Sequence, residues 1–160
     1  VYDIPARTGV PLSLATLRTL AQHPNIVGIK DCGGDMAKTQ ALIADGQLQL
    51  LAGDDANFFT TLALGGTGAI AASGHVHTAR LVALMQHVLR GELAAAQTLW
   101  RPLQPLIEAL FAEPNPAPKK TLLAQQGLMQ ADLRAPMTVA SQALTERLVA
   151  LSAALEVSPR

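Results

Sequence analysis

Residues 25–30 read Asn-Ile-Val-Gly-Ile-Lys, a short apolar run that ends on a lysine. Two further runs of similar length follow, Leu-Gln-Leu-Leu-Ala-Gly at 48–53 and Gly-Ala-Ile-Ala-Ala at 68–72. Each is bounded by Gly, Pro or Asp and carries apolar side chains on successive residues. This pattern predicts strands covered on both faces, as in a parallel sheet. Residues 1–4, Val-Tyr-Asp-Ile, are interpreted as the end of a fourth strand.

Segments with helical periodicity lie between these runs. Residues 12–22 repeat leucine and alanine at helical spacing, residues 35–45 begin with Asp35 as a capping residue, and residues 54–64 begin with two acids. Acidic and capping side chains favour a helix N-terminus. The order β-α-β-α-β-α-β predicts an α/β fold with a parallel sheet and right-handed crossovers.

The second half of the chain changes character and contains no strand-like run. Four helices are predicted, at 76–89, 93–110, 117–126 and 140–155. Four strands can form a small open sheet, whereas a (β/α)8 barrel needs eight. The chain starts within its first predicted strand, which suggests the C-terminal half of something larger.

Composition excludes several classes of protein. The 160 residues contain 12 basic and 12 acidic side chains, 49% hydrophobic residues and one cysteine. A chain with this many hydrophobic residues is not disordered. It also lacks the excess of basic residues that is typical of a nucleic-acid binder. One cysteine excludes a disulfide framework and a Cys-rich zinc site. No apolar run reaches the roughly 18 residues of a membrane span.

Lys30 is the first candidate for chemistry. It ends a buried strand, and active sites of parallel α/β folds lie at the carboxyl ends of strands. An amine that loses part of its hydration there is available as the neutral nucleophile, which forms a Schiff base with a carbonyl substrate. The alternative is a strand-end lysine whose ammonium simply reaches solvent.

Two further residues suit the same chemistry. Tyr2, the only tyrosine, lies near a strand end and could relay a proton, or could pack between strand and helix. Arg7, in the following loop, could bind a carboxylate through its forked guanidinium, or could lie at the surface.

Other motifs are weaker. The glycine-rich segments at 32–35, 53–55 and 65–68 match neither GxGxxG nor a Walker A loop. Asp54 and Asp55 are expected to cap a helix rather than hold a metal. His75 and His77 lack a third ligand, and Cys32 is expected to be a buried structural thiol.

Together these segments resemble the dihydrodipicolinate synthase/N-acetylneuraminate lyase family of pyruvate aldolases. Tyr-Asp-Ile-Pro-Ala-Arg-Thr-Gly at 2–9 resembles its Tyr-Asn-x-Pro-x-Arg-Thr-Gly motif, and Gly-Ile-Lys-Asp at 28–31 resembles its Schiff-base lysine motif. Segments 51–55, 65–70, 113–116 and 136–138 resemble later landmarks of the family, in the same order.

The resemblance implies roles for five residues. Lys30 would condense with pyruvate and Tyr2 would pass protons. Gly53 and Ile70 would line the pyruvate pocket with their backbones. Arg7 would hold the carboxylate of L-aspartate 4-semialdehyde, which favours the synthase branch and a product of the lysine and diaminopimelate route.

The resemblance also implies the setting of the reaction. It implies that the reaction uses small-molecule substrates and needs no metal and no organic cofactor. It also implies that the protein has no nucleic-acid or membrane partner, that the full-length protein is a homotetramer, and that it is located in the cytoplasm. The family's barrel starts well upstream, so the resemblance implies that this chain is an incomplete fragment. Residues 1–75 would be the C-terminal half of an α/β, TIM (β/α)8 barrel, and residues 76–160 would be the last barrel helix and a C-terminal helical region.

Some residues depart from the family pattern. Asp3 stands where the family has Asn, and Asp31-Cys32 stands where it has Glu-Ala. The segment at 71–75 differs as well. Two alternatives therefore stay open: a related 2-keto acid aldolase that takes a sialate-type or keto-deoxy sugar-acid aldehyde, and a catalytically dead, truncated module.

Overall fold

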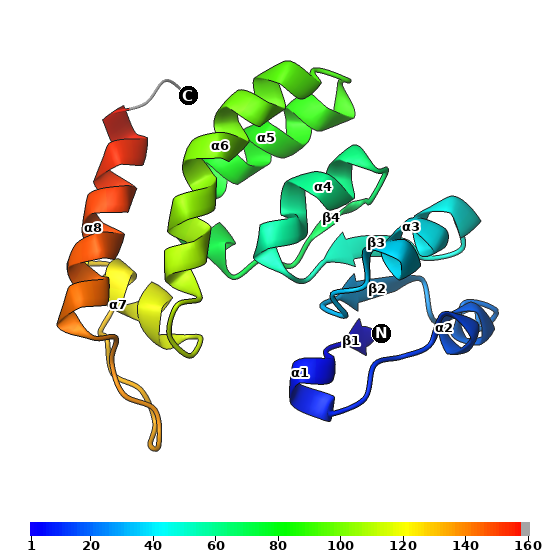
Figure 1. Ribbon diagram of the computed structural model, residues 1–160, viewed down its shortest axis with the longest axis horizontal. Helices are drawn as coiled ribbons and strands as arrows, with labels where there is room; N and C mark the ends of the chain where they lie inside the picture. The colour runs from blue at the N-terminus through cyan, green and yellow to red at the C-terminus, as the bar shows by residue number, and fades with distance from the viewer. Residues whose placement is uncertain (158–160) are drawn as a thin grey trace. The chain divides into compact units, whose positions relative to one another are not determined.

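The computed structural model describes residues 1–157, which divide into two compact units. The first comprises Val1–Ala71 with Val88–Gly91, and the second comprises Ala72–His87 and the chain from Glu92 onward (Figure 1). The predicted assignment of residues 1–75 and 76–160 to two regions remains a prediction.

The first unit is built on a parallel sheet of four strands in the order β1-β2-β3-β4. The strands are β1 (Tyr2–Asp3), β2 (Gly28–Asp31), β3 (Gln49–Ala52) and β4 (Gly68–Ala69). Tyr2 pairs with Lys30, and Lys30 pairs with Leu51. The parallel sheet is as the sequence predicts, but the strands are shorter than the apolar runs.

Burial alternates along the strands of this chain, and the less buried face is the one that a (β/α)8 barrel turns toward its interior. Ile29 and Leu50 are buried, whereas Lys30 and Leu51 are only half-buried and Tyr2 is 47% exposed. The reason is that successive side chains of a strand point to opposite faces, and the helices of this unit cover one face. The opposite face, which carries Tyr2 and Lys30, stays accessible.

The helical segments of the first unit follow the predicted order, except that the short helix α1 was not predicted. They are α1 (Pro5–Thr8), α2 (Leu14–Leu20), α3 (Met36–Asp45), the 3-10 turn η1 (Asp55–Asn57) and α4 (Phe58–Ala63). Ser13, Asp35 and Asp54 accept hydrogen bonds from backbone N–H groups at the starts of α2, α3 and η1. The core joins leucines of α2 and α3 to the strands: Leu17, Ile29, Leu42, Leu48 and Leu50.

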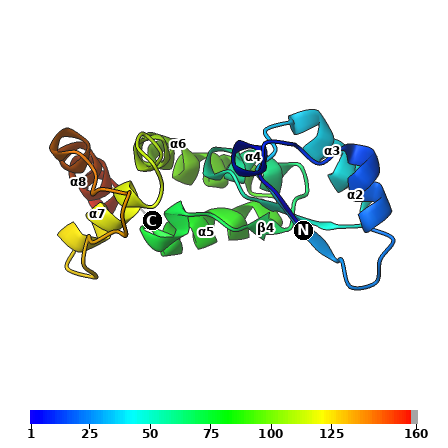
Figure 2. The ribbon, with the colours of Figure 1, turned by 90° about the horizontal axis from the view of Figure 1, so that it is seen from below.

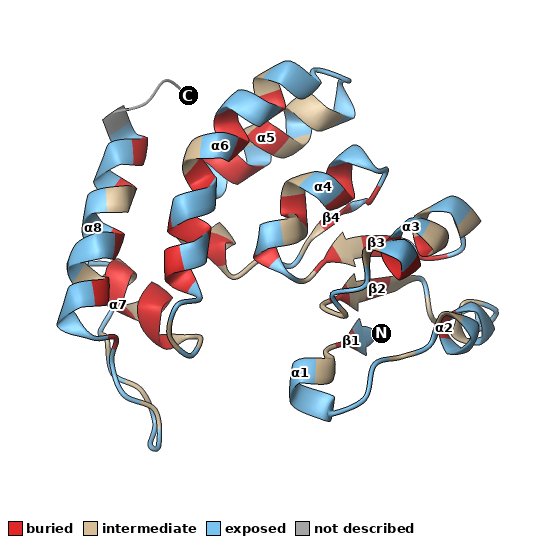
Figure 3. Ribbon diagram, in the orientation of Figure 1, coloured by how far each residue is buried: buried red, intermediate tan, exposed pale blue. Residues whose placement is uncertain are grey.

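The second unit contains helices and no strand among its described residues. Its elements are η2 (Ser73–His75), α5 (Thr78–Leu89), α6 (Leu93–Leu110), α7 (Ala117–Gln125) and α8 (Gln142–Val157). α8 packs against both α6 and α7 (Figure 2). Buried residues recur along α6 every three or four positions, among them Leu99, Leu103 and Leu106 (Figure 3). No helix within residues 1–157 is long and apolar enough to cross a membrane.

Candidate active site

Lys30 and Tyr2 lie side by side on the accessible face of the sheet. They occupy paired positions on adjacent parallel strands, and the Lys30 Nζ atom lies 4.4 Å from the centroid of the Tyr2 ring. The Lys30 N–H also donates to the Val1 carbonyl at 2.9 Å, which fixes β2 against β1. The sheet register therefore places an amine and a phenol together at the carboxyl ends of two strands.

Gly53 has no side chain, and the Lys30 side chain occupies the space that a side chain there would fill. A Cβ atom at Gly53 would lie 2.7 Å from Lys30 Cγ and 2.5 Å from Cys32 Sγ. Both distances are shorter than carbon and sulfur contacts allow. The Gly53 N–H donates to the Asp31 carbonyl at 2.9 Å, so the backbone at this point is fixed. A side chain at residue 53 would have to displace Lys30 or Cys32.

Cys32 belongs to this site, which the sequence analysis missed. Its thiol donates to the Tyr2 hydroxyl at 3.9 Å, and it is half-buried rather than buried. Burial raises the pKa of the Cys32 thiol, so the neutral form that can donate to Tyr2 prevails. The signal in the sequence was its position two residues after Lys30, because residues i and i+2 of a strand share a face.

Arg7 and Ile70 lie near the same end of the sheet but make no contact with Lys30 among the interactions of the described residues. Arg7 is exposed in the last turn of α1, and its side chain forms no ion pair within residues 1–157. Ile70 follows β4, is 51% exposed, and its N–H donates to the Ala52 carbonyl at 2.9 Å. The Arg7 guanidinium is thus available to an anionic ligand.

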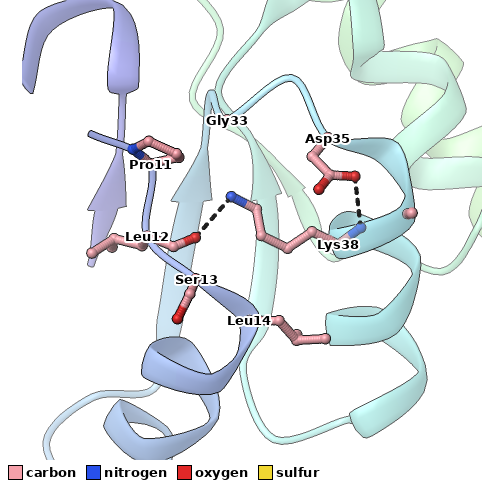
Figure 4. A pocket seen from close by; sticks show the side chains of 8 residues that line it. Pro11, Leu12, Ser13, Leu14, Gly33, Asp35 and Lys38 are labelled. Carbon is pink, nitrogen blue, oxygen red and sulfur yellow. Dashed lines mark hydrogen bonds between the residues drawn. The ribbon is translucent and has the colours of Figure 1, made fainter. Parts of the chain in front are cut away.

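A cluster of buried polar residues lies on the other side of the same strand ends. Asp3 and Asp31 follow Tyr2 and Lys30 directly and point to the helix-covered face, where Lys38 of α3 pairs with Asp3 and Thr39 of α3 donates to Asp31. Figure 4 shows the Lys38 side chain reaching across to the Leu12 carbonyl, with Asp35 capping the start of α3. A cavity of about 510 Å³ opens beside this lysine.

The weaker motifs have structural partners. Asp54 caps η1, as predicted, by accepting from the Ala56 N–H at 3.3 Å. His77 Nε2 lies 3.0 Å from Ser152 Oγ, within the helical unit. No three His, Cys, Asp or Glu side chains gather as a metal site in the part of the chain that the structure describes.

Three comparisons with known proteins agree with one another. The model of the dihydrodipicolinate synthetase family matches residues 1–155. The chain is 38% identical to 4-hydroxy-tetrahydrodipicolinate synthase 2 of Clostridium acetobutylicum over 151 residues, which cover 92% of this chain and 53% of that protein. The chain spans about half the length of the curated relatives it matches.

Solved structures give the same result for the fold. The dihydrodipicolinate synthase of Acinetobacter baumannii, inhibited by chloride and complexed with pyruvate, superposes with a TM-score of 0.92 at 32% identity, covering 98% of this chain and 55% of that one. The 4-hydroxy-tetrahydrodipicolinate synthase of Methylacidiphilum fumariolicum SolV superposes with a TM-score of 0.92 at 32% identity. The match covers 97% of this chain and 53% of that one.

These comparisons settle the fold class that the sequence predicted. The fold is α/β, the C-terminal half of a (β/α)8 barrel followed by a helical region. The chain belongs to the dihydrodipicolinate synthetase family.

Proposed function

We propose that this chain provides the Schiff-base lysine of a pyruvate-dependent lyase of the 4-hydroxy-tetrahydrodipicolinate synthase type. One observation carries the proposal: the Lys30 amine lies 4.4 Å from the Tyr2 ring centroid on paired residues of adjacent strands. A nucleophilic amine beside a proton donor is what imine formation requires. The names of the relatives supply the reaction class.

The proposed reaction starts with imine formation. The neutral Lys30 amine attacks the keto carbon of pyruvate, and the Tyr2 hydroxyl gives a proton to the departing oxygen, which leaves as water. The Tyr2 phenolate then removes a proton from the methyl carbon, and the iminium becomes an enamine. Lys30 acts as the electron sink, so the chemistry needs neither a metal nor an organic cofactor.

The enamine next forms the new carbon–carbon bond. Its methylene carbon attacks the aldehyde carbon of L-aspartate 4-semialdehyde, and the alkoxide takes its proton from Tyr2. The amine of the bound aldehyde then displaces Lys30 as the neutral amine and closes the ring, and the Tyr2 phenolate takes the proton that the ring nitrogen loses, giving 4-hydroxy-tetrahydrodipicolinate. Arg7 would hold the aldehyde's carboxylate, because a guanidinium binds a carboxylate through two parallel hydrogen bonds.

Replacing the lysine tests the proposal. In the full-length protein that contains this chain, Lys30→Arg should lower kcat by at least about a thousandfold, because a guanidinium stays protonated and cannot form the imine. Lys120→Arg, in the helical unit, is the matched control and should leave turnover unchanged. Full turnover by the folded Lys30→Arg variant would refute the proposal.

The acceptor aldehyde is tested separately. L-aspartate 4-semialdehyde and sugar-acid aldehydes are compared as substrates at saturating pyruvate. The proposal predicts the higher kcat/KM for the semialdehyde, and a preference for a sugar-acid aldehyde would assign the chain to the related aldolases. The homotetramer that the family resemblance implies is part of the proposal, and sedimentation of the full-length protein tests it.

A further inference from the structure

The strand ends that carry Tyr2 and Lys30 rest on a buried ion pair. Asp3 is 1% exposed and Lys38 is 7% exposed, and the Lys38 Nζ atom lies 2.5 Å from Asp3 Oδ2. Charged side chains are rarely buried to this extent unless they are paired. Asp3 directly follows Tyr2, so the pair joins β1 to α3 at the edge of the candidate active site.

The same two residues also hold the segment that carries Arg7. The Lys38 Nζ atom donates to the Leu12 carbonyl at 3.2 Å, and the Leu12 N–H donates to Asp3 Oδ1 at 3.1 Å. Leu12 therefore forms one hydrogen bond with each member of the ion pair, donating to Asp3 and accepting from Lys38. Residues 4–12 leave the sheet directly after Asp3 and return to it at Leu12, so this contact closes the segment into a loop.

Apolar packing does little to fix the middle of that loop, although Leu12 at its returning end packs against the core of the first unit. None of the residues of α1 (Pro5–Thr8) is buried, and Val10 is 70% exposed. Thr8 Oγ1 donates to the Ile4 and Val10 carbonyls, which stabilises the turn itself but not its position against the sheet. The contacts of Asp3 and Lys38 with Leu12 are the polar link between the returning end of the loop and the strands.

A second set of contacts, made by Asp31, fixes the end of β2. The Thr39 hydroxyl donates to Asp31 Oδ2 at 2.6 Å, and the Gly33 N–H donates to Asp31 Oδ1 at 2.9 Å. A Cβ atom at Gly33 would lie 2.7 Å from Lys38 Nζ and 2.9 Å from Asp3 Oδ2. The polar cluster thus leaves no room for a Cβ atom at residue 33, and Lys38 of α3 can reach Asp3 because residue 33 has no side chain.

We infer that Lys38 is a positioning residue for the aldehyde site, acting with Asp3 as a clamp on the Arg7 loop. The inference rests on the proposed function, since it gives Arg7 the task of holding the aldehyde's carboxylate. Lys38 does not touch substrate. It sets where residues 4–12 lie relative to Tyr2 and Lys30, and thereby where a bound aldehyde meets the enamine.

The test compares substrate constants and hydrogen exchange in the full-length protein that contains this chain. Lys38→Met should raise KM for the acidic aldehyde by about tenfold or more, because misplacement of about 1 Å at a binding group is costly. KM for pyruvate should stay within about twofold, since Lys30 itself is unchanged. Amide exchange of residues 5–12 should become faster, and borohydride trapping of pyruvate on Lys30 should persist.

A neutral double variant keeps the test independent of folding. Lys38→Met leaves Asp3 as a buried unpaired charge, which destabilises the fold, whereas Asp3→Asn with Lys38→Met removes both charges. The double variant still lacks the donor to the Leu12 carbonyl, so faster exchange in residues 5–12 and a raised aldehyde KM are expected there too. Arg18→Gln, which breaks the exposed Arg18–Asp45 pair, is the matched control and should change neither.

The outcomes separate the two proposals. If the wild-type protein traps pyruvate on Lys30 but the folded double variant keeps the wild-type aldehyde KM and exchange rates, the clamp is refuted and the proposed function stands. If the wild-type protein traps no pyruvate while exchange in residues 5–12 still rises in the variants, the proposed function fails and the clamp on the loop is retained.

Discussion

Packing against neighbouring residues, rather than a hydrogen bond to its amine, sets the position of the Lys30 side chain. The Tyr2 ring lies 4.4 Å from its Nζ atom, and Gly53 leaves room for its methylene groups. A cation over an aromatic face is stabilised without being fixed by a carboxylate. Lys30 thus contacts an aromatic ring, whereas Lys38 is held in a buried ion pair with Asp3.

Gly53→Ala is expected to disable the site without unfolding the chain. The new Cβ atom would lie 2.7 Å from Lys30 Cγ, so the lysine must move, and we expect kcat/KM to fall by about a hundredfold. Gly74→Ala is the control, since nothing lies within 4 Å of its Cβ position. Steady-state kinetics measure the loss of activity, and a circular dichroism spectrum checks that the variant is folded. Wild-type activity of Gly53→Ala would contradict the role given to residue 53.

At this scale the sequence predicted part of the site. Lys30 and Tyr2 could be found because each lies at the end of a short strand, and strand ends of a parallel sheet share one edge. Cys32 and the Asp3–Lys38 pair were missed, because which side chains meet on a face depends on strand register. A pairing between residues 35 positions apart leaves no local pattern in the sequence.

Helices were predicted more closely than strands. α6 spans Leu93–Leu110 as predicted, although it contains Pro102 and Pro105. Each proline removes one N–H, which frees the carbonyl four residues earlier, at Thr98 and Arg101. Both of those residues are exposed, so water can satisfy the freed carbonyls, and the apolar face of the helix is preserved. Hydrophobic periodicity was therefore the better guide than the prolines.

Strand limits and the single turn of α1 were not predictable in the same way. β4 has two residues where the apolar run has five, because only Gly68 and Ala69 pair with β3. α1 starts at Pro5 and ends at Gly9, whose φ of 80° is a conformation that glycine adopts readily. A four-residue helix without buried side chains gives no periodic signal.

The docking of α8 is expected to weaken in acid. Burial, with the nearby charge of Arg80, lowers the pKa of His77, whose Nε2 atom lies 3.0 Å from the buried Ser152 hydroxyl. The unfolded chain therefore binds the proton more tightly than the folded chain. The free energy of unfolding should fall as the pH drops below the ordinary histidine pKa of about 6.5, and should be restored above it.

Urea unfolding at pH 7.5 and at about pH 5.5 measures this loss directly. His77→Gln keeps a polar group near Ser152 but does not titrate, so its stability should change less between the two pH values. His23, exposed in the first unit, provides the control variant His23→Gln, which should lose as much stability in acid as the wild-type chain. An equal loss in the His77→Gln variant would contradict this assignment.

Over the whole molecule, the sequence sufficed for the fold class and for the order of elements, because hydrophobic periodicity and the capping residues agree along the chain. In this chain the helices cover one face of the sheet, and the other face carries Tyr2, Lys30 and Leu51. A (β/α)8 barrel turns that face toward its interior, so its exposure here reflects that the chain spans about half the length of its relatives.

Borohydride trapping tests the central claim most directly. The full-length protein that contains this chain is incubated with pyruvate, reduced, digested and analysed by peptide mass spectrometry. The chain has four lysines, Lys30, Lys38, Lys119 and Lys120, and of these only Lys30 lies beside the tyrosine of the candidate site. We predict a reduced pyruvate adduct on Lys30 that is absent without pyruvate and absent from Lys30→Arg. A folded protein that carries no adduct on Lys30, or carries it on another lysine, would contradict the account.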